Sequence, residues 1–412
     1  MKLFFNEIKR ILNVRLLLII SFMGIIVWFA LLNDVLQAYD SLTSNGIYGT
    51  YQIELFERYG STLEEDERND FDIPGKKTAL LLELDEMILN NSLFQEKNIE
   101  NFESYQDFLT ASVMEGQSEQ EIEAQELLVN QMQNILSNQA QTIEEWNASP
   151  LVKLQTLESL EQTYVNYEDW LKYLALDESP IVAQSAKTAI QNQNNNLARI
   201  DLTESFSYYA LTVSIFSMIA LLVLLIPYVM GSRVGEIFAV QYSSATGRKI
   251  FAVQWLTVVA YSMLFSVVLV VLAYLPYLFN GGFNYWYASI FGLHLDSTGL
   301  QLYDQTFGQY VMTLAVIAIA LNLCLANVLF ILARFSRNIM LLLMKSVPLL
   351  LAIAGVASLS MLNLFSNQNH LFRLLLNGRI KYVEVIASLL LVLISSILVG
   401  ILINREQQVD IL

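Results

Sequence analysis

Cysteine and histidine are almost absent from this sequence, which has one cysteine and two histidines among 412 residues. Because Cys324 is alone, the chain cannot form an internal disulfide, and its charged middle part must be stabilised by packing. His294 and His370 are too few for a zinc site built from three protein histidines. We therefore expect neither a disulfide framework nor a metal site.

Two motifs of common enzyme classes are also missing. The sequence has no GxxxxGKS/T phosphate-binding loop, so we do not expect this chain to bind ATP by that route, and it has no HExxH motif. The acidic run from Glu64 to Glu67 is typical of a solvated surface and not of paired catalytic acids. We predict that the chain is not an enzyme and holds no cofactor of its own.

Charge is absent from six apolar runs of membrane-spanning length. They cover residues 16–33, 206–230, 250–279, 311–333, 346–363 and 385–403. About 20 predominantly apolar residues cross a bilayer as a helix, which satisfies its own backbone polar groups. The sequence therefore predicts an all-α polytopic membrane protein with six transmembrane helices, the first at residues 15–36 and the other five within 206–412. For the first run, a secretory signal peptide is the alternative, but no small-x-small cleavage site follows it.

Basic residues fall on one side of these predicted spans. They lie before the first span, after the second, between the fourth and fifth, and in the tail: Lys2, Lys9, Arg10, Arg15, Arg233, Arg248, Lys249, Arg334, Arg337, Lys345 and Arg405. The positive-inside rule then places both termini in the cytoplasm. Arg373, Arg379 and Lys381 would lie outside, and we expect residues 364–382 to form a re-entrant segment instead.

An acidic block separates the first two spans. From Asp34 to Ser205 there are 32 acidic and 9 basic residues, a net charge of −23, whereas the whole chain has −16. We predict that residues 37–205 form an extracellular domain, since the block lies on the side opposite to the basic segments. Its charge is typical of a solvated face, and the alternative is attraction of cationic ligands.

Apolar residues in this block recur at helical spacing. The pattern is clearest at residues 79–88, 124–136 and 151–174, and alternating strand patterns are scarce. Pro150 is suited to the first turn of a helix, because proline lacks the N–H that this turn leaves unpaired. The extracellular domain is therefore predicted to be helical.

The first fourteen residues have an amphipathic pattern. Phe4, Ile8 and Ile11 fall on one face of a helix, and Lys9 and Arg10 fall on another. We predict an interfacial helix at residues 1–14 that lies on membrane lipid at the cytoplasmic surface. The alternative is a positively charged flank that only fixes the topology.

The connection between the second and third spans, residues 231–249, is the most informative cytoplasmic segment. It is expected to contain a short helix from Glu236 to Tyr242, then a serine-rich turn and two basic residues. The positions that we expect to couple this segment to a partner are Arg233, Gly235, Glu236, Tyr242, Ser243, Ser244, Arg248 and Lys249. Such a helix and basic turn can present one apolar face and a few charges to a protein beneath the membrane.

These residues resemble the permease subunits of the ABC-2 family, the type V ABC exporters. The family pattern has a cytoplasmic Glu, a nearby Gly, a short coupling helix, a small-residue turn and an Arg or Lys before the next span. In this chain Gly235 precedes Glu236, and the turn lacks the proline that many members have. The order of interfacial helix, first span, external domain and five further spans with a re-entrant segment is similar to the family as well.

The resemblance implies the partners and the activity. Two permeases, identical or different, would pair in a bacterial cell membrane, and cytoplasmic ABC ATPase subunits with bound ATP and Mg would dock on the coupling segments. The complex would export an amphipathic substrate such as a peptide, with no role for nucleic acid. The alternatives are a subunit that transmits motion to, or senses a ligand at, its extracellular domain without transport, and a receptor or scaffold without an ATPase.

Polar residues within the spans are few. Asn322 and Asn327 in the fourth span lie about 140° apart around a helix with 100° per residue, so they do not share a face. Hydrogen bonds between helices are the favoured interpretation for these two residues, and lining of a translocation path is the alternative.

Overall fold

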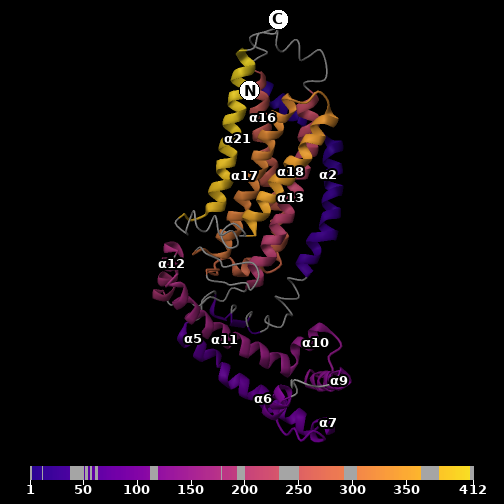
Figure 1. Ribbon diagram of the computed structural model, residues 1–412, viewed down its shortest axis with the longest axis vertical. Helices are drawn as coiled ribbons and strands as arrows, with labels where there is room; N and C mark the ends of the chain where they lie inside the picture. The colour runs from indigo at the N-terminus through magenta and orange to yellow at the C-terminus, as the bar shows by residue number, and fades with distance from the viewer. Residues whose placement is uncertain are drawn as a thin grey trace. The chain divides into compact units, whose positions relative to one another are not determined.

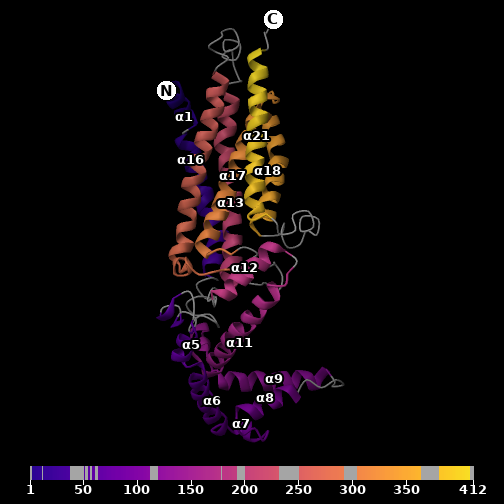
Figure 2. The same ribbon diagram turned by 90° about the vertical axis from the view of Figure 1, so that its left-hand side faces the viewer.

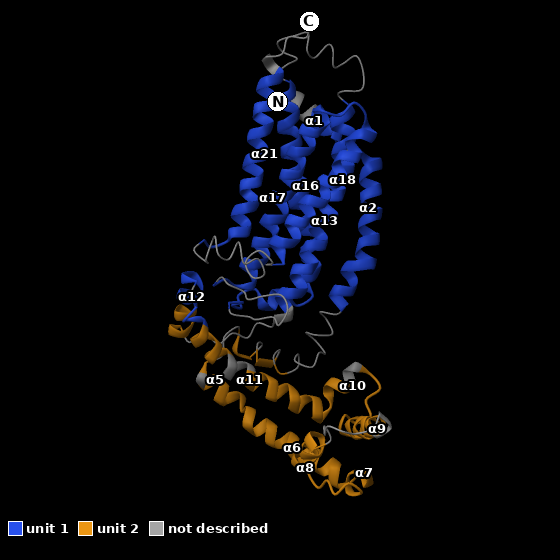
Figure 3. Cartoon of the chain, in the orientation of Figure 1, with its two compact units in different colours: residues 1–37, 174–185, 198–412 blue, residues 38–173, 186–197 orange. Residues whose placement is uncertain are grey.

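The computed structural model describes residues 2–11, 13–37, 51, 54–55, 58–60, 64–111, 119–177, 179–192, 200–231, 250–291, 304–362 and 380–408. Within these ranges the chain is almost entirely helical, and the only β structure is an isolated bridge between Ser289 and Thr306. The predicted all-α class is confirmed for this part of the chain. The chain divides into two compact units (Figure 3). Residues 1–37, 174–185 and 198–412 form the membrane unit, and residues 38–173 and 186–197 form the acidic unit.

Six helices in the described ranges are long and apolar enough to cross a membrane, as predicted. The first span, Val14–Gln37, contains α2 (Val14–Val27) and a π-helical turn, η1 (Trp28–Leu32). The others lie in α13 (Ile200–Gly231), α16 (Ile250–Phe279), α17 (Phe307–Arg334), α18 (Ile339–Met361) and α21 (Val383–Gln408). The protein is therefore a multi-pass membrane protein.

Helix α17 lies inside the bundle of the membrane unit. It packs against α13, α16, α18 and α21, and these helices run side by side in both views (Figures 1 and 2). Most of its apolar residues are buried, including Leu314, Leu321 and Leu329. Helices α13, α16, α18 and α21 are thus arranged around α17, and α2 packs against α13.

The outer helices expose large apolar side chains. Phe22 on α2, Leu351 on α18 and Leu393 on α21 are 64%, 67% and 55% exposed. Such apolar surface is unfavourable in water but matches the hydrocarbon core of a bilayer, where these side chains contact lipid.

The start of α18 corrects the predicted boundary of the fifth span. The helix begins at Ile339 and not near residue 346, because the side chain of Asn338 accepts a hydrogen bond from the backbone N–H of Leu341 at 2.8 Å. Lys345 is therefore inside the helix and not in a connecting loop. Its Nζ donates to the carbonyl oxygen of Phe335 at 2.7 Å, as a long basic side chain near a helix end can do.

A folded connection joins α16 to α17. After α16, the 3₁₀ turn η2 (Gly282–Tyr285) follows Gly281, whose φ of 102° favours glycine. The chain then pairs with the start of α17, where the Phe307 N–H donates to Ala288 O at 2.9 Å and the Gly308 N–H donates to Trp286 O at 2.9 Å. These bonds hold one end of α16 and α17 together.

The acidic unit is built from helices as well. They are α5 (Glu65–Phe71), α6 (Ile73–Leu89), α7 (Ser92–Gln95), α8 (Phe102–Ala111), α9 (Glu119–Leu136), α10 (Ile143–Ala148) and α11 (Pro150–Leu174), while α12 (Pro180–Gln191) is divided between the units. Helix α11 begins at Pro150, as predicted. The core includes Leu84, Phe94, Leu136 and Leu154, all fully buried.

Three acidic residues of this unit have structural roles. The Glu64 N–H donates to Glu67 Oε2 at 2.8 Å as part of a capping box that starts α5. Asp72, with φ 51°, separates α5 from α6 and accepts a hydrogen bond from the Gly75 N–H at 3.0 Å. The run Glu64–Glu67 therefore contributes to a helix start.

Candidate functional site

Four helix ends meet at one end of the bundle in the membrane unit. Helix α1 (Lys2–Ile11) packs against α13 and α16, and the last residue of α17, Arg334, contacts Phe251 in the first turn of α16. We call this the α1 end, and it also contains the C-terminal end of α21 (Figures 1 and 2). Helix α1 and the C-terminal end of α21 thus lie on the same side of the bundle, as an even number of spans requires.

One face of helix α1 is buried against α13 and α16. Ile11 is 1% exposed and Glu7 is 8% exposed, whereas Lys9 and Arg10 are exposed and Ile8 is half-buried. The side chain of Phe4 lies outside the described residues. Ile11 is one helical turn after Glu7, so both lie on the same face of α1. The amphipathic pattern predicted the helix, and its contact with lipid remains a prediction.

Glu7 makes the central contact of the α1 end. Its Oε2 accepts a hydrogen bond from the Tyr228 hydroxyl of α13 at 2.8 Å, and Arg10 Nη1 lies 3.1 Å from Oε1 and 3.2 Å from Oε2. The Arg10 guanidinium also lies 6.0 Å from the centre of the Tyr228 ring. A buried carboxylate is costly unless it is paired and hydrogen-bonded, and these two partners meet that requirement. The contact fixes α1 to α13 three residues before Gly231.

Arg334 makes a second contact at this end. It is the last residue of α17, and its guanidinium lies 3.6 Å from the ring centre of Phe251 and 5.4 Å from that of Phe330. A cation over an aromatic ring contributes about 0.5–2 kcal/mol, and a cation at a helix C-terminus is also favoured by the helix dipole. Since Phe251 is the second residue of α16, this contact fixes the start of α16 to α17.

Segment 232–249 therefore connects two helix ends that are held by named contacts. The predicted coupling residues Arg233, Gly235, Glu236, Tyr242, Ser243, Ser244, Arg248 and Lys249 all lie in it, outside the described residues. The predicted re-entrant segment 364–382 is outside them too, except for residues 380–382, which form a turn before α21. The structure thus places the flanks of the coupling segment and not its side chains.

Within the spans, asparagines join helices. Asn322 of α17 donates to the Ser217 hydroxyl of α13. Asn327, on another face of α17, accepts from Trp255 Nε1 of α16 at 2.9 Å and donates to Ser395 and Ser396 of α21, each at 3.0 Å. These contacts are the hydrogen bonds between helices that the sequence favoured. Cys324 is buried on the same helix.

Helices α13 and α16 are also joined at the opposite end of the bundle. The Tyr209 hydroxyl donates to Ala273 O at 2.6 Å, and Ser205 Oγ lies 2.6 Å from the Tyr277 hydroxyl. The Phe206 ring contacts the rings of Tyr274, Tyr277 and Phe307 edge-on. Hydrogen bonds and ring contacts thus fix the start of α13 to the end of α16.

Sequence reasoning missed Glu7. Its signal is simple, because Glu7 is the only acidic residue before Asp34 and lies among four basic residues. An isolated acid on the apolar face of a basic helix indicates a buried partner. In the described part of the chain, no group of three His, Cys, Asp or Glu residues is arranged to hold a metal ion.

No protein-family model, curated protein or solved structure matches this chain.

Proposed function

We propose that this chain is the membrane subunit of an ATP-driven ABC exporter of the ABC-2 type. In this proposal the α1 end faces the cytoplasm of a bacterial cell, and the acidic unit lies outside. Cytoplasmic ABC ATPase subunits, which hold ATP and Mg, dock on residues 231–249. The chain pairs with a second permease, identical or different, and together they move an amphipathic substrate such as a peptide outward.

One observation carries the proposal. The segment with the coupling pattern joins two helices whose ends at the α1 end are fixed, α13 by Glu7 and α16 by Arg334. A partner that pushes on this segment would move α1, α13, α16 and α17 together, because the contacts resist independent motion of any one helix. A segment that transmits force from a partner needs fixed helix ends on both sides. A loop that only connects two spans does not need them.

The second candidate is transmission of motion without transport. Helix α13 is continuous for 32 residues from Ile200 to Gly231, so a single helix crosses the bundle and ends at the coupling segment. Motion at the α1 end could then be carried along α13 to Ile200 without a path for substrate between the spans. This continuity favours a mechanical role as the alternative to export.

Purification of the tagged chain from its native membrane tests the proposal. We expect an ABC ATPase to co-purify, together with a second permease if the pair is not identical. Reconstitution of that complex in vesicles then separates the two candidates, since ATP-dependent uptake of a labelled amphipathic peptide requires export. Absence of any ATPase from the purified complex would contradict both candidates.

A further inference from the structure

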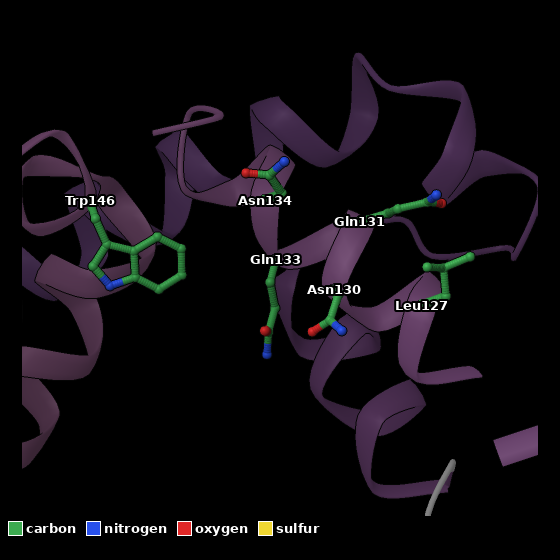
Figure 4. Close-up of a pocket in the computed structure, with 6 residues that line it drawn as sticks. All are labelled: Leu127, Asn130, Gln131, Gln133, Asn134 and Trp146. Atoms are coloured by element: carbon green, nitrogen blue, oxygen red, sulfur yellow. The ribbon is translucent and has the colours of Figure 1, made fainter. Parts of the chain in front are cut away.

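An open pocket in the acidic unit lies between α9 and α10 and has a volume of about 360 Å³ (Figure 4). Its lining residues are Leu127, Asn130, Gln131, Gln133, Asn134 and Trp146. The volume is at the lower end of the range of about 300–1,000 Å³ that is typical of small-ligand pockets. Four of the six side chains are carboxamides, one is an indole, and none is charged.

The lack of charge distinguishes this pocket from its surroundings. Residues 127–143 form the longest uncharged stretch of the strongly acidic block 34–205, although α9 begins with glutamates at 119, 121, 123 and 126. A pocket for a cationic ligand would be expected to use these abundant carboxylates. A neutral polar lining in an acidic domain instead favours a neutral polar ligand.

Most of the pocket-lining residues of α9 lie on its exposed face and not in the core. Residues 127, 130, 131 and 134 follow the spacing of one helical face, and all four are exposed. Met132 and Leu136, on the other face, are fully buried in the core and hold α9 in place. The exposed amides therefore contribute little to stability and are available for contacts with a ligand.

Hydrogen bonds at both ends of α10 fix the backbone that carries Trp146. Trp146 is half-buried in α10, whose first turn is capped by Thr142, the acceptor for the Glu145 N–H at 3.2 Å. The Ser149 hydroxyl donates to Trp146 O at 2.6 Å. In Figure 4, Gln133 and Asn130 extend side by side, with the Trp146 ring across from them.

This combination matches the chemistry of a sugar. Each hydroxyl of a sugar is both a donor and an acceptor, and a carboxamide supplies two N–H donors and a carbonyl acceptor. The C–H face of a sugar ring is apolar and can cover an indole ring, while the polar edge of the ring reaches the amides. No carboxylate lines the pocket, so the pair of acids that glycoside hydrolysis requires is missing from it.

We propose that this pocket binds neutral carbohydrate, without hydrolysing it. The proposal is independent of the exporter function, because it rests only on the residues of the acidic unit. If that unit lies outside the cell, the ligand is a glycan of the cell surface or its surroundings.

The test is a binding titration with the full-length protein in phosphatidylcholine nanodiscs, which avoids detergents with sugar head groups. The probes are two neutral trisaccharides, triacetylchitotriose and maltotriose, followed by calorimetry and by the change in tryptophan fluorescence. We expect at least one to bind with a Kd below about 10 mM. The double variant Asn130→Ala/Gln131→Ala should weaken binding by about tenfold or more, because it removes two carboxamides that would hydrogen-bond the sugar. Folding should be unaffected, because both side chains are exposed.

Two further variants complete the test. Trp146→Ala should abolish the fluorescence change and weaken binding, whereas Gln155→Ala, an exposed amide on α11 away from the pocket, should leave both unchanged. Failure of both trisaccharides to bind overturns the proposal. Unchanged binding in the double variant would also overturn it. Competition by trialanine as strong as that by the sugars would overturn it too, since the pocket would then be a peptide site.

Discussion

At the scale of single residues, buried polar contacts decide how the spans are joined. Glu7 is the clearest case, because a carboxylate with 8% exposure is stable only while Tyr228 and Arg10 satisfy it. An exposed ion pair such as Lys172 with Asp169 and Glu168 contributes little by comparison, since water screens both charges.

Tyr228→Phe should therefore loosen α1 from the bundle. The variant removes the hydroxyl that donates to Glu7 Oε2 and leaves Arg10 as the partner of this carboxylate. A hydrogen bond to a charged group contributes about 1.5–3 kcal/mol. Cys324, the single cysteine of the chain, is buried and can report on unfolding through its reaction with a thiol-reactive fluorophore. We expect labelling at a temperature several degrees lower than in the parent protein.

Tyr208→Phe is the matched control, because Tyr208 is on the same helix but 44% exposed. It should label at the temperature of the parent protein. Equal labelling temperatures for both variants and the parent would mean that the Glu7 contact does not hold α1.

Tyr105 gives the acidic unit a dependence on high pH. Burial raises the pKa of this tyrosine from 10 to about 12, and the nearby Gln133 offsets part of that effect. Below pH 10 the phenol is protonated in both the folded and the unfolded chain. As the pH rises toward 12, the unfolded chain loses this proton first, so the stability of the unit falls.

Denaturant unfolding of the full-length protein at about pH 9 and about pH 11, followed by tryptophan fluorescence, measures this loss. Tyr105→Phe should lose less stability over that interval than the parent protein, whereas Tyr173→Phe, at an exposed position on α11, should lose as much. The same loss in all three proteins would show that Tyr105 is not the cause.

At the scale of helices, α13 and α16 behave as a pair. They are joined through Tyr209 and Ser205 at one end, and both contact α1 at the other. The fixed points are Tyr228, three residues before the end of α13, and Phe251, the second residue of α16, so both helix ends that flank segment 232–249 are held.

Changes within the coupling segment should thus affect ATP hydrolysis more than folding. We expect Glu236→Ala and Arg248→Glu to insert and fold normally but to reduce substrate-stimulated ATPase activity of the purified complex. Removing one partner of a charged contact in an interface can cost on the order of 2 kcal/mol or more. Lys2→Ala, in α1, is the control and should change this activity very little. Full stimulation in both variants, with the ATPase still bound, would place the coupling contact on another loop.

At the scale of the whole molecule, the sequence predicts what depends on local composition. Length and hydropathy were sufficient for the six spans, and helical spacing was sufficient for the helices of the acidic unit. The start of α18 was missed because the charge of Lys345 suggested a loop, whereas its long side chain allows it to remain within a helix.

Contacts between distant parts of the chain could not be predicted in this way. Glu7 and Tyr228 are 221 positions apart, and neither residue shows which helix it will face. The carboxamides of α9 are visible as a helical face, but only folding brings Trp146 of α10 beside them. Both sites arise from packing, for which a single sequence contains little information.

The most direct test of the account is the side of the membrane on which each part of the chain lies. In a Cys324→Ser background, a new cysteine at Gln155 in the acidic unit or at Arg248 in the coupling segment would be the only thiol of the protein. We expect an impermeant maleimide added to intact cells to label Gln155→Cys, and to label Arg248→Cys only after the cells are opened. Protection of Gln155→Cys in intact cells, or labelling of Arg248→Cys there, would contradict the six-span topology and the docking of a cytoplasmic ATPase on residues 231–249.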